Sequence, residues 1–236
     1  MNKIYHQADS RGRADHGWLL SKHTFSFANY YNPERMGFGL LRVLNDDIVQ
    51  PGKGFGRHPH ENMEIVSIPL LGALRHQDSM GHEDVIRGGE VQVMSAGSGI
   101  THSEFNASND EEVHFLQIWV QPKKRNITPR YNQLGFAASE RQNRWQTVVA
   151  PDDTPGALGI NQDAWFSLAN LDAGAELSYQ LKRHGNGLYL FVLEGEVTID
   201  DQNLERRDGL GITGTEMISL AAEGQAELLL IDVPMR

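Results

Sequence analysis

The chain has 236 residues, which is enough for one large domain or two small ones, each with a buried core. Its formal charge of -10 disfavours direct binding to nucleic-acid phosphates. The absence of cysteine excludes disulfides, thiolate metal ligands and a cysteine nucleophile. No apolar run reaches the roughly 18 residues of a membrane span, so we expect a soluble, cytoplasmic protein without a membrane partner.

In chain order, short strands separated by glycine, proline and polar turns dominate the pattern. Residues 23–31 alternate apolar and polar side chains and predict a half-buried strand. Residues 40–44 predict another strand, Asn45-Asp46-Asp47 a turn, and Ile48-Val49 a further short strand. Strands are predicted next at residues 65–71, 73–77, 83–86, 90–94, 101–106 and 113–120. Many short strands at this spacing predict an antiparallel all-β sandwich or barrel.

A basic stretch with two prolines, residues 122–131, predicts a linker. Beyond it the strand pattern resumes, and residues 188–197 resemble residues 65–74 in their order of strand, glycine turn and strand. This internal repeat indicates two β-barrels of one design. We therefore expect an N-terminal barrel at residues 1–130 and a C-terminal barrel at residues 131–236.

Histidines and acidic residues recur at spacings that place them on one face of a strand. Positions two apart on a strand share a face, so His58 and His60 point the same way, as do His102 and Glu104. Three imidazoles and a carboxylate suit Fe(II), Mn(II), Ni(II), Cu(II) or Zn(II). Because Glu64 shares the face of His60, the spacing leaves Glu64 and Glu104 both open as the carboxylate ligand.

Several motifs resemble a known family. Gly52, His58-Pro59-His60 and Glu64 are similar to the first cupin motif, and the stretch from Gly89 through His102 to Asn106 is similar to the second. Further stretches resemble pirin and the pirin-like bacterial quercetin dioxygenases: His16-Gly17-Trp18-Leu19, His23-Thr24-Phe25-Ser26-Phe27, His76-Gln77-Asp78-Ser79-Met80-Gly81, Met94-Ser95-Ala96-Gly97-Ser98-Gly99-Ile100 and His102-Ser103-Glu104. One departure is Ser95, which stands where the general second motif has proline.

The resemblance implies a bicupin, with two packed antiparallel barrels and one Fe(II) in the first. It implies that His58, His60, His102 and Glu104 are the metal ligands and that the second barrel is metal-free. The implied reaction is the opening of a flavonol ring, such as that of quercetin, by O2 with release of carbon monoxide, and Glu104 is the implied proton acceptor. Glu64 would then orient a ligand imidazole or lie on the barrel rim.

A planar aromatic substrate requires an apolar slot. The sequence offers wall candidates near the motifs, namely Phe55, Met63, Met94, Phe105 and Phe115. His114 lies on a predicted strand and faces either this slot or the core, while His16 and His23 are expected to hold the first strand in place. The alternative function is a non-enzymatic, iron-dependent regulator of the pirin type that binds a protein partner. Both functions use the same ligands, so the ligands do not separate them.

Overall fold

The computed structural model describes residues 1–152 and 154–236, and β-strands make up most of both ranges. The helical elements in these ranges are two short 3-10 helices, η1 (Ala8–Ser10) and η2 (Ala138–Arg141). The prediction of an all-β chain is therefore confirmed. Within the described ranges, no helix has the length and apolar character needed to cross a membrane.

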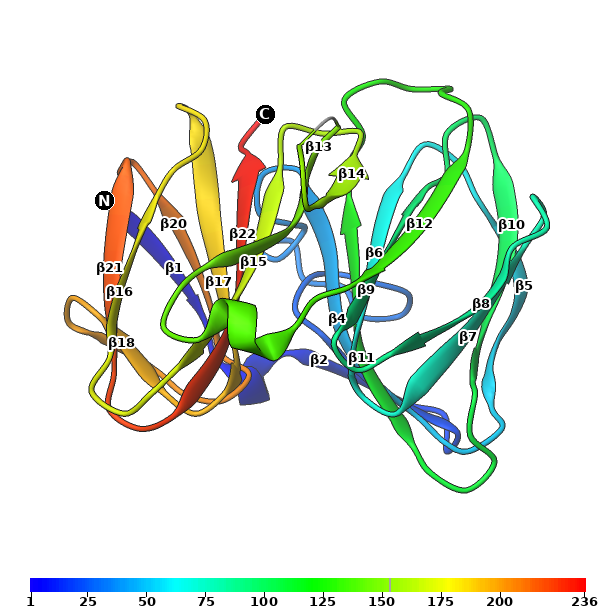
Figure 1. Cartoon of the computed structure of the whole chain (residues 1–236), viewed down its shortest axis with the longest axis horizontal. Coiled ribbons are helices and arrows are strands. Elements are labelled where there is room, and N and C mark those ends of the chain that lie inside the picture. Colours follow the sequence, from blue (N-terminus) through cyan, green and yellow to red (C-terminus); the bar gives the residue numbers. More distant parts are fainter. Residues whose placement is uncertain (153) are drawn as a thin grey trace.

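The first half of the chain forms two sheets that enclose the right-hand barrel of Figure 1. Its seven-stranded sheet has the order β12 (Arg130–Gly135), β9 (Glu90–Ser95), β6 (Glu64–Leu71), β11 (Val113–Val120), β4 (Leu41–Val49), β3 (Leu19–His23) and β2 (Gly12–Asp15). Its four-stranded sheet has the order β5 (Gly54–His60), β10 (Ile100–Asn106), β7 (Ala73–Asp78) and β8 (Glu83–Arg87).

The second half repeats this arrangement of seven and four strands. The seven-stranded sheet has the order β1 (Asn2–His6), β20 (Gly209–Thr213), β17 (Asn186–Glu194), β22 (Ala226–Pro234), β15 (Trp165–Leu171), β13 (Gln146–Pro151) and β14 (Leu158–Ile160). The four-stranded sheet has the order β16 (Glu176–Gln180), β21 (Met217–Ala222), β18 (Val197–Ile199) and β19 (Gln202–Leu204). The strand pairs are antiparallel in the described residues, apart from the parallel pair β13–β14.

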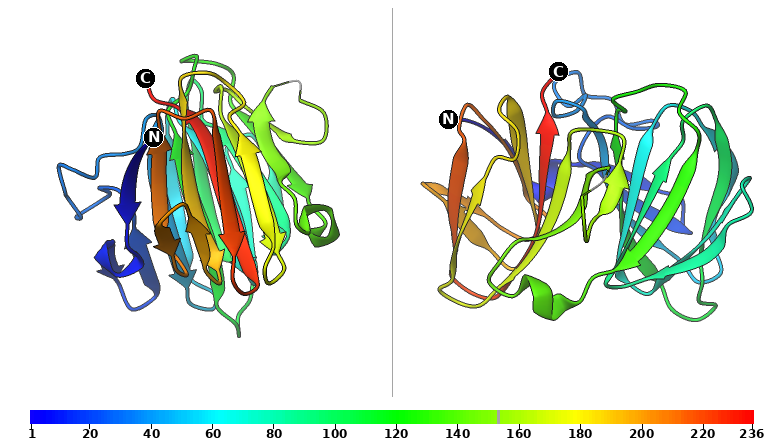
Figure 2. Two further views of the ribbon diagram at one scale, coloured as in Figure 1. Left: turned by 90° about the vertical axis from the view of Figure 1, so that its left-hand side faces the viewer. Right: turned by 45° about the horizontal axis from the view of Figure 1, so that its top comes forward.

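The two seven-stranded sheets lie on the inner sides of the barrels and pack against each other (Figure 1 and Figure 2). Their shared apolar cluster includes Val66 and Leu116 from the first half and Phe166, Tyr189 and Leu229 from the second. Burial of such side chains contributes roughly 1.5–3 kcal/mol each. The halves are therefore joined by a continuous core.

Two strands pair across the boundary expected at residue 130. The N-terminal strand β1 pairs with β20 of the second half, and Figure 1 shows it in blue beside the orange strand. Strand β12 begins at Arg130 and pairs with β9 of the first half. His6 at the end of β1 is buried, and its Nδ1 lies 2.8 Å from the Tyr189 hydroxyl. The N-terminal strand β1 thus belongs to a sheet of the second half, whereas the strands that follow it form the sheets of the first half.

Two predictions of local structure are wrong. The predicted turn Asn45-Asp46-Asp47 lies inside β4, because all three polar side chains are buried and face partners or a cavity. Residues 24–31, predicted as part of a strand, lie beyond β3, which ends at His23. Ala28 beyond it has a left-handed φ of 48°, which an extended strand does not accommodate.

Asp46 connects the two halves electrostatically. One carboxylate oxygen accepts hydrogen bonds from the Arg11 guanidinium at 3.3 and 3.4 Å and lies 3.5 Å from Arg207 Nε of the second half. The other oxygen lies 2.5 Å from His114 Nε2. Although burial alone raises a carboxyl pKa, the His114 hydrogen bond and the charges of Arg207 and Arg11 hold the pKa of Asp46 at about 2.

The substitution Asp46→Asn is expected to lower the free energy of unfolding by about 3 kcal/mol at neutral pH, because it leaves buried guanidinium groups without their counter-charge. Since the folded-state pKa is depressed, this stabilisation is present above the ordinary value of 3.8 and is lost as pH falls toward about 2. Denaturant titrations at several pH values measure both effects. The matched control is Glu140→Gln, which removes an exposed pair with Arg144 and should change stability by less than about 1 kcal/mol. Equal losses in the two variants would contradict the assignment.

Candidate metal centre

Three histidines converge where β5 pairs with β10. His102 lies directly opposite His58 in the antiparallel register, and His60 follows two residues later on the same face of β5. The ring centroids of His58 and His102 are 4.4 Å apart, and His60 lies 4.8 Å from each. One ligand nitrogen from each residue lies within 4.8 Å of the others. The predicted convergence of the two histidine motifs is therefore present.

The environment of His60 and His102 favours the neutral imidazole, which is the form that binds a metal. His102 is fully buried, and neither of its ring nitrogens has a hydrogen-bond partner. Burial, together with the neighbouring His58 and His60, lowers the pKa of His102 to about 2, and burial and His58 lower that of His60 to about 4. His58 Nδ1 lies 2.7 Å from the Gly56 carbonyl oxygen, and donation there leaves its Nε2 lone pair free for a cation.

Glu104 follows a shift in the β10–β5 register and points into the barrel. It is 1 % exposed, its Oε1 accepts a hydrogen bond from Ser67 Oγ at 3.2 Å, and its Oε2 accepts one from Gln117 Nε2 at 2.8 Å. Burial raises the pKa of Glu104 to about 7 against the opposing effect of these bonds. A ligand oxygen of Glu104 lies within 4.8 Å of ligand nitrogens of His76 and His102. The carboxylate therefore adjoins the imidazole cluster and is held in one orientation.

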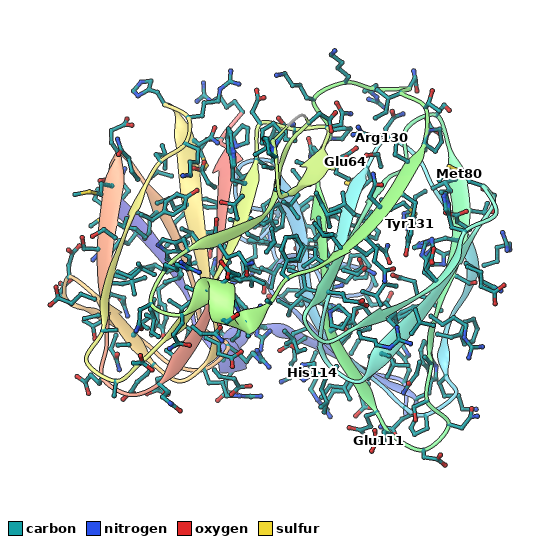
Figure 3. All side chains as sticks on the ribbon, viewed as in Figure 1. Glu64, Met80, Glu111, His114, Arg130 and Tyr131 are labelled. Atoms are coloured by element: carbon teal, nitrogen blue, oxygen red, sulfur yellow. The ribbon has the colours of Figure 1, made fainter. Side chains whose placement is uncertain are left out.

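Glu64, the other carboxylate that spacing left open, has a different environment. Its Oε2 accepts hydrogen bonds from Ser95 Oγ at 2.7 Å and from the Asn161 backbone N–H at 3.1 Å. Asn161 belongs to the second half, and the charge of Arg130 also acts on the carboxylate (Figure 3). Glu64 therefore contacts the neighbouring half of the chain, and its recorded bonds include none to an imidazole in the described residues.

The other histidines separate into those near the cluster and those away from it. His76 on β7 lies beside the cluster, with its ring centroid 5.3 Å from that of His102, and it stacks on Tyr131 at 4.5 Å. His76 belongs to one of the pirin-like stretches, but local spacing does not predict its place beside the cluster, because that place depends on the pairing of β7 with β10. His114 contacts Asp46 on the opposite face of the seven-stranded sheet from the cluster.

A cavity of about 380 Å³ opens beside the cluster, and His58, His60 and Glu104 form part of its wall. Among the five predicted wall residues, Phe55 lines this cavity, whereas Phe115 and Met94 are fully buried in apolar clusters. Sequence reasoning missed the other aromatic wall residues, Trp18, Phe27 and Trp119. His16 and His23, which are expected to hold the first strand in place, also line the cavity.

These residues fit a divalent transition metal. Imidazole suits iron, nickel, copper and zinc, and the Glu104 carboxylate, which is grouped with His76 and His102, offers an oxygen ligand. The unpartnered nitrogens of buried His102 are the strongest structural argument, because buried polar groups without partners are rare. The candidate ligands form two groups that share His102: one group adds His58 and His60, and the other adds His76 and Glu104.

Comparison with known proteins agrees with the fold and the motifs. Residues 5–120 match the family model described as Pirin, and residues 147–233 match that of the quercetinase C-terminal cupin domain. A protein named quercetin 2,3-dioxygenase from Escherichia coli K12 is 44% identical over 232 residues, which cover 97% of each chain. A pirin-like protein from Caulobacter vibrioides is 42% identical over 225 residues, covering 95% of this chain and 96% of that one.

Solved structures give the same result. The crystal structure of the bacterial pirin YhhW from Escherichia coli in complex with nickel(II) has a TM-score of 0.93 at 43% identity and covers 99% of both chains. A second structure of YhhW has a TM-score of 0.94, covering 99% of this chain and 98% of that one. Since the relatives match nearly the whole length at this level of identity, the chain belongs to the pirin family.

Proposed function

We propose that this protein is a metal-dependent dioxygenase that opens the ring of quercetin-like flavonols with O2 and releases carbon monoxide. The proposed metal is Fe(II), held by His58, His60, His102 and Glu104. The observation that carries the proposal is the convergence of three imidazoles, two of which line an aromatic-walled cavity together with the buried carboxylate of Glu104. The relatives named quercetin 2,3-dioxygenase and the nickel-bound pirin support the same reaction class.

Glu104 is preferred over His76 as the fourth ligand because its carboxylate adjoins His102 and also lines the cavity next to His58 and His60. The Nε2 atom of His76 instead has Asp78 as its partner. A ligand that faces the cavity acts on both the cation and a bound substrate. His76 lies behind His102, with Nε2 at 3.3 Å from Asp78 Oδ2, and is therefore suited to packing and orienting the cluster.

Each group has a distinct part in the proposed reaction. A bound divalent metal supplies Lewis acidity, which lowers the pKa of the flavonol 3-hydroxyl. Glu104, oriented by Ser67 and Gln117, accepts the proton of that hydroxyl. The aromatic walls, Trp18 and Phe55 among them, bind the planar rings and exclude water from the electron-rich substrate.

Metal-stripped protein reconstituted anaerobically with Fe(II) is expected to consume quercetin when air is admitted. Loss of the flavonol absorbance and release of carbon monoxide measure the reaction, and protein without added metal is the control. Stoichiometric iron binding without flavonol consumption would overturn the dioxygenase. It would favour the alternative of an iron-dependent regulator that binds a protein partner.

Glu104→Gln is expected to lose at least about 100-fold in turnover, because it removes both the anionic ligand and the proton acceptor. Glu64→Gln is the matched control, since Glu64 is an equally buried carboxylate that bonds Ser95 and Asn161 away from the cluster. It should retain metal and activity. Iron stoichiometry and turnover are measured on both variants. Loss of iron in Glu64→Gln alone would assign the ligand to Glu64 and refute the proposed set.

Metal addition is expected to stabilise the wild type by about 2.7 kcal/mol at a free metal concentration 100 times Kd. His102→Gln should abolish this gain because His102 belongs to the proposed set. His184→Gln is the control, since His184 is an exposed histidine of the second half that pairs with Glu216. Thermal unfolding with and without metal measures the gain in each variant. A full gain in His102→Gln would exclude His102 as a ligand.

A further inference from the structure

A row of polar residues crosses the inner face of the first seven-stranded sheet. In the strand register His23 pairs with Asn45, Asn45 with Gln117, Gln117 with Ser67, and Ser67 with Gln92. All five side chains are buried. Polar side chains rarely share a barrel interior without a reason, since each must find a partner there. Three members of the row, His23, Asn45 and Gln117, line the cavity beside the metal centre.

Asp47 stands beside this row, two residues from Asn45 on the same face of β4. It pairs in register with Ser21, whose hydroxyl donates to Asp47 Oδ1. Both residues line the cavity. In the described residues, the hydrogen bonds reach Oδ1 of Asp47 and none reaches Oδ2. One oxygen of a buried carboxyl is thus left for a partner within the cavity.

Two neighbouring residues, Asn45 and His23, also carry unpartnered polar atoms. Asn45 Oδ1 and His23 Nδ1 are buried without a hydrogen-bond partner, and both residues line the cavity. These two atoms have almost no exposed surface, so the acceptor open to a ligand in the cavity is Oδ2 of Asp47, and Asn45 and His23 add polar groups around it. Burial raises the pKa of Asp47 to about 7, with the charges of Asp46 and Glu104 adding to the effect, so the carboxyl either accepts or donates near neutral pH.

The distance between this wall and the reacting group follows from the sheet spacing. Gln117 on β11 bonds Glu104, β4 is the next strand and β3 the one after it. Neighbouring strands lie about 4.8 Å apart, so His23 lies about 10 Å along the row from Gln117. That separation matches the length of a planar molecule with two or three joined rings. A substrate whose reacting ring adjoins Glu104 therefore extends another ring over β4 and β3.

We propose that Asp47, with Ser21, Asn45 and His23, binds hydroxyl groups of the substrate that are remote from the reacting ring. The site thereby selects polyhydroxylated planar aromatics over apolar molecules of the same shape. This inference rests on the proposed flavonol-binding function of the cavity and adds the residues that determine its specificity. Aromatic walls bind any planar ring system, whereas the polar wall recognises its hydroxyl pattern.

Equilibrium binding of two flavonols tests the proposal. Quercetin and 3-hydroxyflavone share the 3-hydroxyl and the adjacent carbonyl, and quercetin carries the additional hydroxyl groups. Kd values are measured without oxygen on zinc-loaded protein, so that turnover does not interfere. The wild type is expected to bind quercetin more tightly than 3-hydroxyflavone. Asp47→Leu, of similar shape, should weaken quercetin binding by roughly 10- to 100-fold and leave 3-hydroxyflavone within about 2-fold.

Two further variants separate recognition from damage to the pocket. Asp47→Asn retains one acceptor oxygen and is expected to restore part of the affinity for quercetin. Phe27→Leu alters an aromatic wall residue and should weaken both flavonols to a similar extent.

An equal effect of Asp47→Leu on both flavonols, or no effect on either, would overturn the specificity role while leaving the dioxygenase intact. If the metal-loaded wild type binds neither flavonol, both the specificity role and the dioxygenase proposal are overturned. The wild type is therefore measured before the variants.

Discussion

The antiparallel register between β5 and β10 is the constraint on which the site depends. It sets His102 opposite His58, while the two-residue period of the strand brings His60 and Glu104 to the same interior. A slip of one residue would turn each of these side chains to the opposite face. The site is thus specified by main-chain hydrogen bonds on strands rather than by loops, which gives the ligand side chains a rigid support.

The two barrels have the same arrangement of sheets, but their interiors contain different kinds of side chains. The second barrel encloses a single large apolar cluster that includes Leu188, Leu190, Leu210, Leu228 and Leu230. The first barrel has two small clusters, and the buried histidines, Glu104 and the polar row lie between them. The space occupied by those polar groups contributes no apolar burial. Stability of the first barrel therefore depends more on its packing against the second, through the core between the seven-stranded sheets.

Local patterns in the sequence predicted the strands and the histidine pairs, because a same-face spacing of two is a property of the strand itself. They did not predict His76 or Trp119 as neighbours of the site, since pairing between distant strands is decided by the whole barrel. The resemblance to pirin supplied Glu104 in place of Glu64, a choice that spacing left open. The turn predicted at the polar run of residues 45–47 is wrong, because exposed runs of this kind form turns, whereas tertiary partners hold this one in a strand.

Residues 46 and 47 of β4 have different roles on the two faces of the strand. Asp46 and Asp47 are adjacent, so their side chains point to opposite faces of β4. Asp46 meets Arg11 and Arg207, and its pKa is about 2; Asp47 meets the cavity and Ser21, and burial raises its pKa to about 7. Asp46 is ionised and connects the halves of the molecule, whereas Asp47 is partly protonated near neutral pH and faces the proposed substrate. Asp46 and Asp47 are neighbours on β4, so the contacts of Asp46 with the second barrel help to position the cavity wall at Asp47. The second barrel thus contributes to the geometry of a site whose residues lie in the first.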